Sequence, residues 1–393
     1  MTDAMARAER LAPRMAERAA DYDRDAAFPR RDIEELREEG LLGLMVPSRL
    51  GGLGAGFEEY TRVAVALAGG NASTALLFNM HASVTGGLAS ISDELALGMG
   101  AAESFFDARD RILRAAVDGA MYGVAITEPG VGSRLSELRS TYEAEEGRYR
   151  IRGTKAFCSG AGHLDGYLVA ARRAGSAEDQ PTISYFLVPN GDGLRVDDTW
   201  DPLGMRATAS NGMEIDAWVG EDGLLGGVEG LVLPLANAMP QWLVASYAAV
   251  YVGLAEAAIR EAVSYLRTRP VAGERGALAN LAPVRQRVGR AEAEVHASRL
   301  ALERAARQVD LRPGDPETNR STYRAKLLAG DAAMRVASSM AEACGLGALR
   351  RGAPLERILR DARSGAIMPP SSDVTGNHLG AIALGAEDGL APW

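Results

Sequence analysis

Three long segments in the second half of the chain repeat apolar residues with the period of a helix, and they limit the possible folds more than any other feature. They cover residues 242–267, 284–309 and 321–344. Helices of this length with one broad apolar face bury that face against each other. The longest apolar run, from Trp242 to Ala255, is about 14 residues and ends at Glu256, whereas a bilayer span needs ~20. The segments therefore predict a bundle around a buried core helix, and no membrane span.

The sequence pattern changes twice along the chain. Residues 1–120 have helical periodicity, with Gly40 placed to close one helix and Asn71 to cap another. Short strands are expected at 149–152, 166–172, 183–188 and 213–217, separated by turns that contain Gly, Asp and Pro. Helical periodicity returns near residue 230. We therefore expect an α+β chain of three domains: a helical one (1–120), a β domain (121–229) and a second helical one (230–393).

Composition argues against several classes of function. The formal net charge of −9 gives no electrostatic footprint for nucleic acid and no basic patch for a membrane. Two cysteines, Cys158 and Cys344, cannot build a disulfide framework, and four scattered histidines do not indicate a metal site. The first residues mix alanine with charged residues and lack the apolar stretch of a secretory signal. We expect a cytoplasmic protein without a metal.

The stretch from Ala125 to Ser159 carries the residue types that most indicate chemistry. Thr127 and Ser133 are hydroxyl donors beside glycines, which allow the backbone to come close to a flat or anionic ligand. Phe157 and Ser159 are two apart, so in a strand they share one face. An aromatic ring with nearby hydroxyls could bind a heteroaromatic cofactor. On residue types alone, a hairpin turn with Phe157 as core filler is the simpler interpretation.

Five motifs in order resemble the acyl-CoA dehydrogenase superfamily over essentially the whole chain. They are Phe28-Pro29 through Gly54, Thr127-Glu128-Pro129-Gly130-Val131-Gly132-Ser133, Gly153-Thr154-Lys155-Ala156-Phe157-Cys158-Ser159, Leu203 to Ser210, and Pro354 to Arg363. The resemblance implies a helical N-terminal domain, a central β-barrel-like domain and a C-terminal four-helix bundle. It also implies FAD between the β domain and the bundle, in a homo-oligomer, either a dimer or a tetramer.

The same resemblance implies roles for individual residues. The segment from Val124 to Ser133 would line the flavin, with Val124, Ile126, Thr127, Gly132 and Ser133 as its contacts. Phe157 would cover one face of the ring, and Ser159 would lie near its N5 atom. Gly345 would approach the adenosine half of FAD in a neighbouring subunit; a helix C-cap is an equally good interpretation of that glycine.

One departure from the family pattern bears on the reaction. The glutamate that removes the substrate's α-proton in the dehydrogenases corresponds to Pro369 here. Asp373 is the nearest carboxylate downstream and is our candidate base, although a helix N-cap or a solvated turn residue is the simpler interpretation. His81 and His163 are further candidate acids, and Glu128 is expected to be structural.

These observations leave two functions open. The first, narrowly favoured, is α,β-dehydrogenation of an acyl thioester, carried by coenzyme A or a carrier protein. The alternative is a flavin-dependent monooxygenase that uses reduced flavin and oxygen to hydroxylate a small molecule, which needs no base for a carbon acid. A flavin-binding scaffold without activity is a third interpretation.

Overall fold

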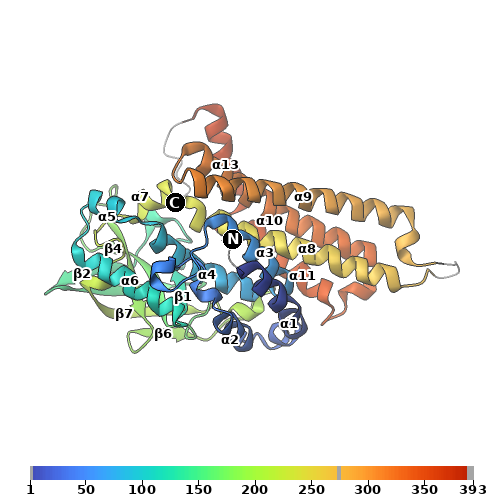
Figure 1. Cartoon of the computed structure of the whole chain (residues 1–393), viewed down its shortest axis with the longest axis horizontal. Helices are drawn as coiled ribbons and strands as arrows, with labels where there is room; N and C mark the ends of the chain where they lie inside the picture. Colours follow the sequence, from blue (N-terminus) through green and yellow to red (C-terminus); the bar gives the residue numbers. More distant parts are fainter. Residues whose placement is uncertain (1–2, 272–275, 387–393) are drawn as a thin grey trace.

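The computed structural model describes residues 3–271 and 276–386, and its elements follow one another in three groups (Figure 1). The first group is helical. It consists of α1 (Ala4–Asp25), α2 (Arg30–Glu38), α3 (Phe57–Gly70), α4 (Ala72–Ser90), α5 (Asp93–Gly98) and α6 (Glu103–Val117). Asn71 caps α4, because its side-chain oxygen accepts the Ser73 N–H at 3.1 Å, and Gly40 ends the α2 segment in the left-handed conformation. The sequence predicts both the capping role of Asn71 and the end of a helix at Gly40.

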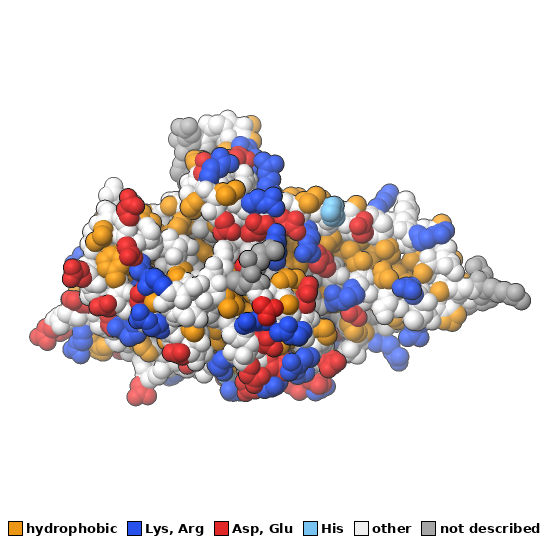
Figure 2. Space-filling view, viewed as in Figure 1, with side chains coloured by type: hydrophobic (Ala, Val, Ile, Leu, Met, Phe, Trp, Pro, Cys, Tyr) orange, Lys and Arg blue, Asp and Glu red, His pale blue; other side chains and the backbone are white. Residues whose placement is uncertain are grey.

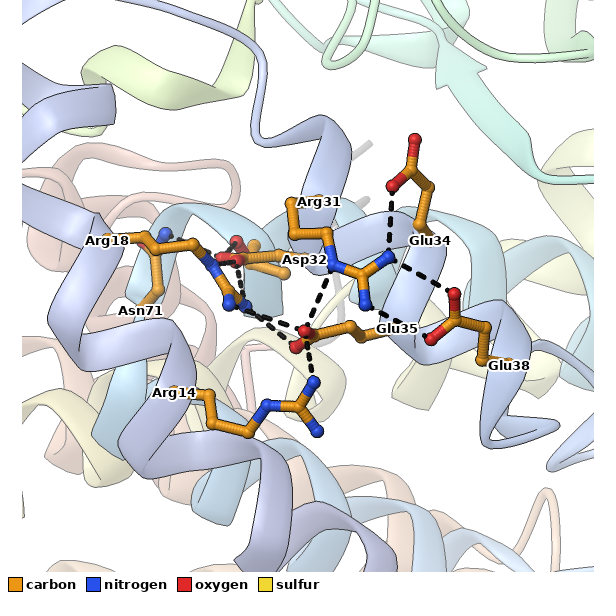
Figure 3. Close-up of polar contacts among 9 residues, drawn as sticks. Arg14, Arg18, Arg31, Asp32, Glu34, Glu35, Glu38 and Asn71 are labelled. Atoms are coloured by element: carbon orange, nitrogen blue, oxygen red, sulfur yellow. Dashed lines mark hydrogen bonds and ion pairs between the residues drawn. The ribbon is translucent and has the colours of Figure 1, made fainter.

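Charged side chains crowd the outer face of α1 and α2 (Figure 2). Two carboxylates of α2, Asp32 and Glu35, are buried and meet the Arg18 guanidinium of α1 at 2.8 and 2.7 Å (Figure 3). The Thr74 hydroxyl of α4 and the side-chain amide of Asn71, the N-cap of α4, donate to the other oxygen of Asp32. Because buried carboxylates are stable only when paired, this cluster fixes α1, α2 and α4 in one arrangement.

The second group is a seven-stranded mixed sheet. Its strands are β1 (Tyr122–Ala125), β2 (Thr141–Glu145), β3 (Arg148–Lys155), β4 (Gly166–Arg173), β5 (Ile183–Pro189), β6 (Leu194–Asp197) and β7 (Gly212–Gly220), in the order β1-β4-β2-β3-β7-β6, with β5 also paired to β4. β3 and β7 are antiparallel, with Lys155 opposite Met213. The end of β3 and the start of β7 therefore lie side by side at one end of the sheet's strands. The segments next to them, 156–159 and 206–211, are brought together there.

The third group is helical again. It contains α7 (Val232–Ala238), α8 (Ala245–Thr268), α9 (Ala282–Leu311), α10 (Pro316–Cys344), α11 (Pro354–Ala362), α12 (Ser364–Ile367) and α13 (Ser372–Leu384). α8, α9 and α10 lie side by side and extend away from the sheet, and α11 packs against α8 and α10 (Figure 1). By length and composition alone the segment Pro240–Thr268 could cross a membrane, but 78% of its apolar window is buried inside the protein. This segment is therefore the buried core helix that the sequence predicts.

The expected α+β class, with helical, β and helical parts in that order, is confirmed. The four strands expected from alternation correspond to β3, β4, β5 and β7, and the three long helical segments to α8, α9 and α10. β1, β2 and β6 were not predicted. They have only 4, 5 and 4 residues, which is too short for a period-of-two pattern to stand out.

Candidate active site

A buried ion pair joins two of the sequence motifs. The Lys155 ammonium, at the end of β3, lies 2.7 Å from the Glu128 carboxylate, and both side chains are buried. Glu128 also accepts the N–H groups of Arg139 and Ser140, and Lys155 donates to the Ala170 carbonyl. Burial alone would raise the pKa of Glu128, but Lys155 outweighs it and holds that pKa below its usual value. Glu128 is therefore structural, as the sequence predicts.

Main-chain hydrogen bonds connect the loops at this end of the sheet, where β3 ends and β7 begins. The Ala156 N–H donates to the Thr127 carbonyl at 2.8 Å, and the Cys158 N–H donates to the Asn211 carbonyl at 3.0 Å. Three non-glycine residues in these loops, Phe157, Met205 and Ala209, have left-handed φ angles of 56°, 54° and 44°. Such conformations cost free energy, and they cluster at functional sites. The loops hold a locally strained backbone in place.

A recess opens between this end of the sheet and the helices. Its empty space, open solvent included, is about 640 Å³. Its lining includes six of the eight predicted cofactor residues and four from the helical parts: Val124, Ile126, Thr127, Ser133, Phe157 and Ser159, with Met80, Leu243, Tyr247 and Met368. Phe157 is exposed over 67% of its surface, an unusual position for a phenylalanine. Neither the Thr127 nor the Ser133 hydroxyl has a hydrogen-bond partner within the described residues.

The recess adjoins a second, apolar cavity, whose empty space, open solvent included, is about 690 Å³. Val124 and Leu243 line both spaces. The wall of the cavity is almost entirely aliphatic and aromatic, with Trp242 and Tyr185 as its largest side chains. Trp242 lies directly over Gly86 of α4, where an added Cβ would come within 2.1 Å of its ring. Glycine at position 86 is what allows the indole to form this wall.

No carboxylate, histidine or amine lines either space in the described part of the chain. The titratable groups there are the phenols of Tyr247 and Tyr185. Burial raises the pKa of Tyr247 to about 12 and raises that of Tyr185 further above its usual value. Among the residues that the structure describes, the one hydrogen-bond partner of the Tyr247 hydroxyl is the Met80 thioether, at 4.0 Å. Both phenols therefore stay protonated near neutral pH and can donate hydrogen bonds.

The structure does not bring Asp373 to the recess, and this corrects its assignment as the candidate base. Ser371 is the N-cap of α13, and Asp373 follows in the first turn with its side chain exposed. A carboxylate is stabilised there by the helix dipole. The N-cap is Ser371 and not Asp373, so Asp373 is a solvated residue of the first helical turn. Pro369 itself lines the recess, in the position where a base was sought.

Two predicted cofactor residues lie outside the lining of the recess. Gly132 belongs to the turn that Glu128 and Gly132 close by reciprocal main-chain bonds, next to Ser133. Gly345, with φ of 74°, is the C-cap of α10, and the nearby Gly347 lines a separate cavity with Tyr265. Tyr265 is 18 residues beyond Tyr247 on α8, which corresponds to about 27 Å along the helix. Gly345 is therefore remote from the recess of its own chain.

The two candidate histidines are also accounted for elsewhere. His81 is buried, with one ring nitrogen 2.7 Å from the Leu42 carbonyl and the other accepting the Tyr122 N–H. Burial lowers its pKa to about 4, so it is a neutral core residue. His163 stacks on Phe28, with ring centroids 4.4 Å apart. Neither lines the recess or the apolar cavity.

Sequence reasoning missed the hydroxyls behind Ser159. Ser210 lies 2.9 Å from the Ser159 Oγ, and Thr208 lies 2.7 Å from Ser210. The segment Leu203–Ser210 was singled out as a motif, but nothing in it indicated which side chains face Ser159. Tyr185 and Tyr247 were also missed, because each reads as an apolar residue of its strand or helix.

Comparisons with known proteins agree over nearly the whole chain. Models of the N-terminal, middle and C-terminal domains of acyl-CoA dehydrogenases match residues 4–94, 123–218 and 244–384. The chain is 30% identical to "Putative acyl-CoA dehydrogenase YdbM" of Bacillus subtilis (strain 168), with 95% of each chain covered. It is also 30% identical to the amino sugar nitrososynthase DnmZ of Streptomyces peucetius, covering 96% of this chain and 92% of that one.

A solved structure resembles the chain equally completely. FMN-bound TdsC from Paenibacillus sp. A11-2 is 26% identical, with a TM-score of 0.85 and 98% of each chain covered. The same enzyme, described as a dibenzothiophene monooxygenase, has also been solved with FMN and indole. The chain is thus similar in sequence and fold to proteins with different reactions.

Proposed function

The chain belongs to the acyl-CoA dehydrogenase family of flavin-dependent oxidoreductases, and within it we propose that this protein is a monooxygenase that uses reduced flavin and oxygen on a small apolar molecule. The observation that carries the proposal is the composition of the two adjoining spaces. They offer a ring-binding surface, unpaired hydroxyls and an apolar chamber, and no group in their described lining that could take a proton from a carbon acid.

The residues present fit a flavin. The exposed Phe157 ring offers a stacking surface, and Thr127, Ser133 and Ser159 offer hydroxyls to the polar edge of a tricyclic ring. Beyond Phe157 lies a wider and more polar cavity, whose empty space, open solvent included, is about 1350 Å³. We propose FAD as the cofactor, with Gly345 and the cavity around Tyr265 serving a second subunit of a homo-oligomer. FMN, as in TdsC, is the other outcome that chromatography of the released flavin distinguishes.

The lack of a base among the described lining residues separates the two candidate reactions. Dehydrogenation of a thioester needs a group near neutral pKa that touches the α-carbon. Pro369 occupies the position expected for it, Asp373 is exposed on α13, and the pKa of Tyr247 is about 12. A phenol with that pKa is almost entirely protonated at pH 7. Oxygen insertion into a sulfur, nitrogen or electron-rich ring does not require such a base, so the geometry favours it.

Each part of the site then has a task. The apolar chamber walled by Trp242 and Tyr185 binds the substrate and excludes water, which protects reactive species from hydrolysis. The Tyr185 hydroxyl in the chamber and the Tyr247 hydroxyl in the recess can each donate a hydrogen bond to an acceptor on a bound molecule. When bound, reduced flavin supplies two electrons and activates oxygen, so that one oxygen atom enters the substrate and the other leaves as water. The similarity to DnmZ and TdsC, whose names describe a nitrososynthase and a monooxygenase, supports this choice.

The test supplies the protein with chemically reduced FAD and follows reoxidation of the flavin in air-saturated buffer. Indole, dibenzothiophene and an aromatic amine serve as probes. We expect at least one probe to yield a product that carries one atom from ¹⁸O₂. Oxygen consumption that gives only hydrogen peroxide with every probe, together with bleaching by an acyl-CoA thioester, would support dehydrogenation instead. A protein that binds neither oxidised nor reduced flavin would contradict both functions.

A further inference from the structure

Three buried hydroxyls form a line that ends at the recess. Ser159, which lines the recess, lies 2.9 Å from Ser210, and Ser210 lies 2.7 Å from Thr208. The Thr208 hydroxyl lies 2.9 Å from the Met205 carbonyl oxygen. All three hydroxyl-bearing side chains are buried, and no other hydrogen bond of theirs occurs among the described residues.

The carbonyl at the inner end determines the direction of the line. A carbonyl oxygen only accepts, so Thr208 donates its single hydroxyl hydrogen to Met205. Thr208 can then only accept from Ser210, whose own hydrogen is used in that bond. Ser210 in turn can only accept from Ser159. The hydrogen of Ser159 therefore points away from the recess, and its Oγ presents lone pairs to whatever binds there.

We propose that Thr208 and Ser210 are positioning residues that hold Ser159 as a hydrogen-bond acceptor, so that the site favours reduced over oxidised flavin. The inference rests on the proposed function and on the flavin N5 atom lying next to Ser159, as the family resemblance implies. Reduced flavin carries a hydrogen on N5, whereas oxidised flavin has a lone pair there. If Ser159 is an acceptor, its oxygen can accept a hydrogen bond from the N5–H of reduced flavin. Opposite oxidised flavin, the same oxygen faces the N5 lone pair, and no hydrogen lies between the two acceptors.

Several contacts fix the Met205 carbonyl, at the inner end of the line of hydroxyls. The Met205 N–H donates to the buried Asp361 of α11 at 2.5 Å, and the Met205 carbonyl also accepts the Thr208 N–H. The Gly160 N–H bonds to the Thr208 carbonyl at 2.8 Å, which holds the Ser159 segment against the Thr208 segment. Gly204 packs on the backbone of Arg360, where an added Cβ would come within 2.3 Å. These contacts keep the carbonyl fixed when the ligand changes.

The expected size of the effect is that of one hydrogen bond. Oxidised flavin can be accommodated if the whole line reverses, so that Ser159 donates into the recess. Reversal leaves the Thr208 hydroxyl beside a carbonyl to which it no longer donates. The net value of one such bond is about a five- to tenfold change in an equilibrium constant. For a two-electron couple this is about 20 to 30 mV in midpoint potential.

The experiment compares the wild type with Thr208→Val, Thr208→Ser and Ser210→Ala. Thr208→Val is nearly isosteric and removes only the hydroxyl that fixes the direction, whereas Thr208→Ser keeps it. Thr322→Val is the matched control, because Thr322 is a buried threonine that also donates to the carbonyl three residues before it, in α10. The readouts are the anaerobic dissociation constants of oxidised and reduced FAD and the midpoint potential of the bound flavin.

We expect Thr208→Val and Ser210→Ala to strengthen binding of oxidised FAD relative to reduced FAD five- to tenfold, and to lower the potential accordingly. Thr208→Ser and Thr322→Val should match the wild type. If flavin binds and the potential of Thr208→Val is unchanged or higher, the inference is overturned and the proposed function stands. If the wild type binds no flavin in either state, both are overturned.

Discussion

Replacing Lys155 by methionine tests whether the Glu128–Lys155 pair holds the recess together. Methionine keeps most of the volume and removes the charge. Glu128 would then be a buried carboxylate whose remaining partners are the N–H groups of Arg139 and Ser140. In the folded protein Lys155 keeps the pKa of Glu128 low, so its loss leaves an ionised group without a counter-ion or forces it to take up a proton.

The magnitude follows from the burial of both partners. Removing one member of a buried ion pair costs about 3–5 kcal/mol, because the charge that remains is uncompensated. Replacing both members by neutral residues of similar shape is often close to neutral. We therefore expect Lys155→Met to lower the free energy of unfolding by about 3–5 kcal/mol. The double variant Glu128→Gln/Lys155→Met should recover much of that loss.

Urea unfolding followed by tryptophan fluorescence measures these differences, and the four proteins of the double-mutant cycle give the coupling free energy. Arg195→Met, which breaks the exposed pair between Arg195 and Glu214 on the same sheet, is the control and should leave stability unchanged. The reasoning is refuted if Lys155→Met is as stable as the control. It is also refuted if the double variant is as unstable as the sum of its single changes.

Three further predictions concern the site and its surroundings. Phe157→Ala should weaken flavin binding roughly tenfold in a fluorescence titration, with Phe157→Trp restoring it; equal affinities would mean that the ring does not stack. Gly86→Ala should destabilise the protein by about 1–3 kcal/mol, since its Cβ would meet Trp242. Gly289→Ala, in a helix with open space, should instead stabilise it by up to about 1 kcal/mol in thermal unfolding. Burial raises the pKa of Asp361 from 3.8 to about 6. Relative to the unfolded state, this carboxyl's contribution to stability is therefore fully present below pH 4, and about 3 kcal/mol is lost as pH rises from about 4 through 6, a slope that Asp361→Asn should flatten in pH-dependent unfolding.

Much of the fold could be predicted because the local signals agree with the final structure. The apolar stripe that begins at Trp242 is buried in the short 3-10 helix Pro240–Trp242 and in α8, and Asn71 caps α4 as its residue type indicates. The position of the sheet's edge strands could not be predicted from pattern alone. β1 is buried on both faces and has four residues, so it shows no alternation.

The residues of the candidate site could also be predicted only in part. Thr127 and Phe157 could be placed together from motifs, and the Ala156 N–H bond to Thr127 and the Glu128–Lys155 pair show the physical connection. The role of Asp373 could not be judged from spacing, because the direction of a side chain depends on where α13 begins. Ser371 caps that helix, and this turns Asp373 outward.

The hydroxyl line could not have been read from the sequence either. Ser159 and Ser210 are far apart in the chain, and they meet only because β3 and β7 pair with Lys155 opposite Met213. A hydrogen-bond direction depends further on the Met205 carbonyl, which belongs to a left-handed turn. Such a relation exists only in three dimensions.

The central claim, that the described residues lining the recess include no base for a carbon acid, is tested most directly by anaerobic mixing of the oxidised holoenzyme with saturated acyl-CoA thioesters of four to sixteen carbons. The flavin absorbance is followed in a stopped-flow instrument. The structure predicts no bleaching by any thioester, while dithionite bleaches the same sample fully. Rapid bleaching by one thioester, with formation of the enoyl product, would contradict the claim.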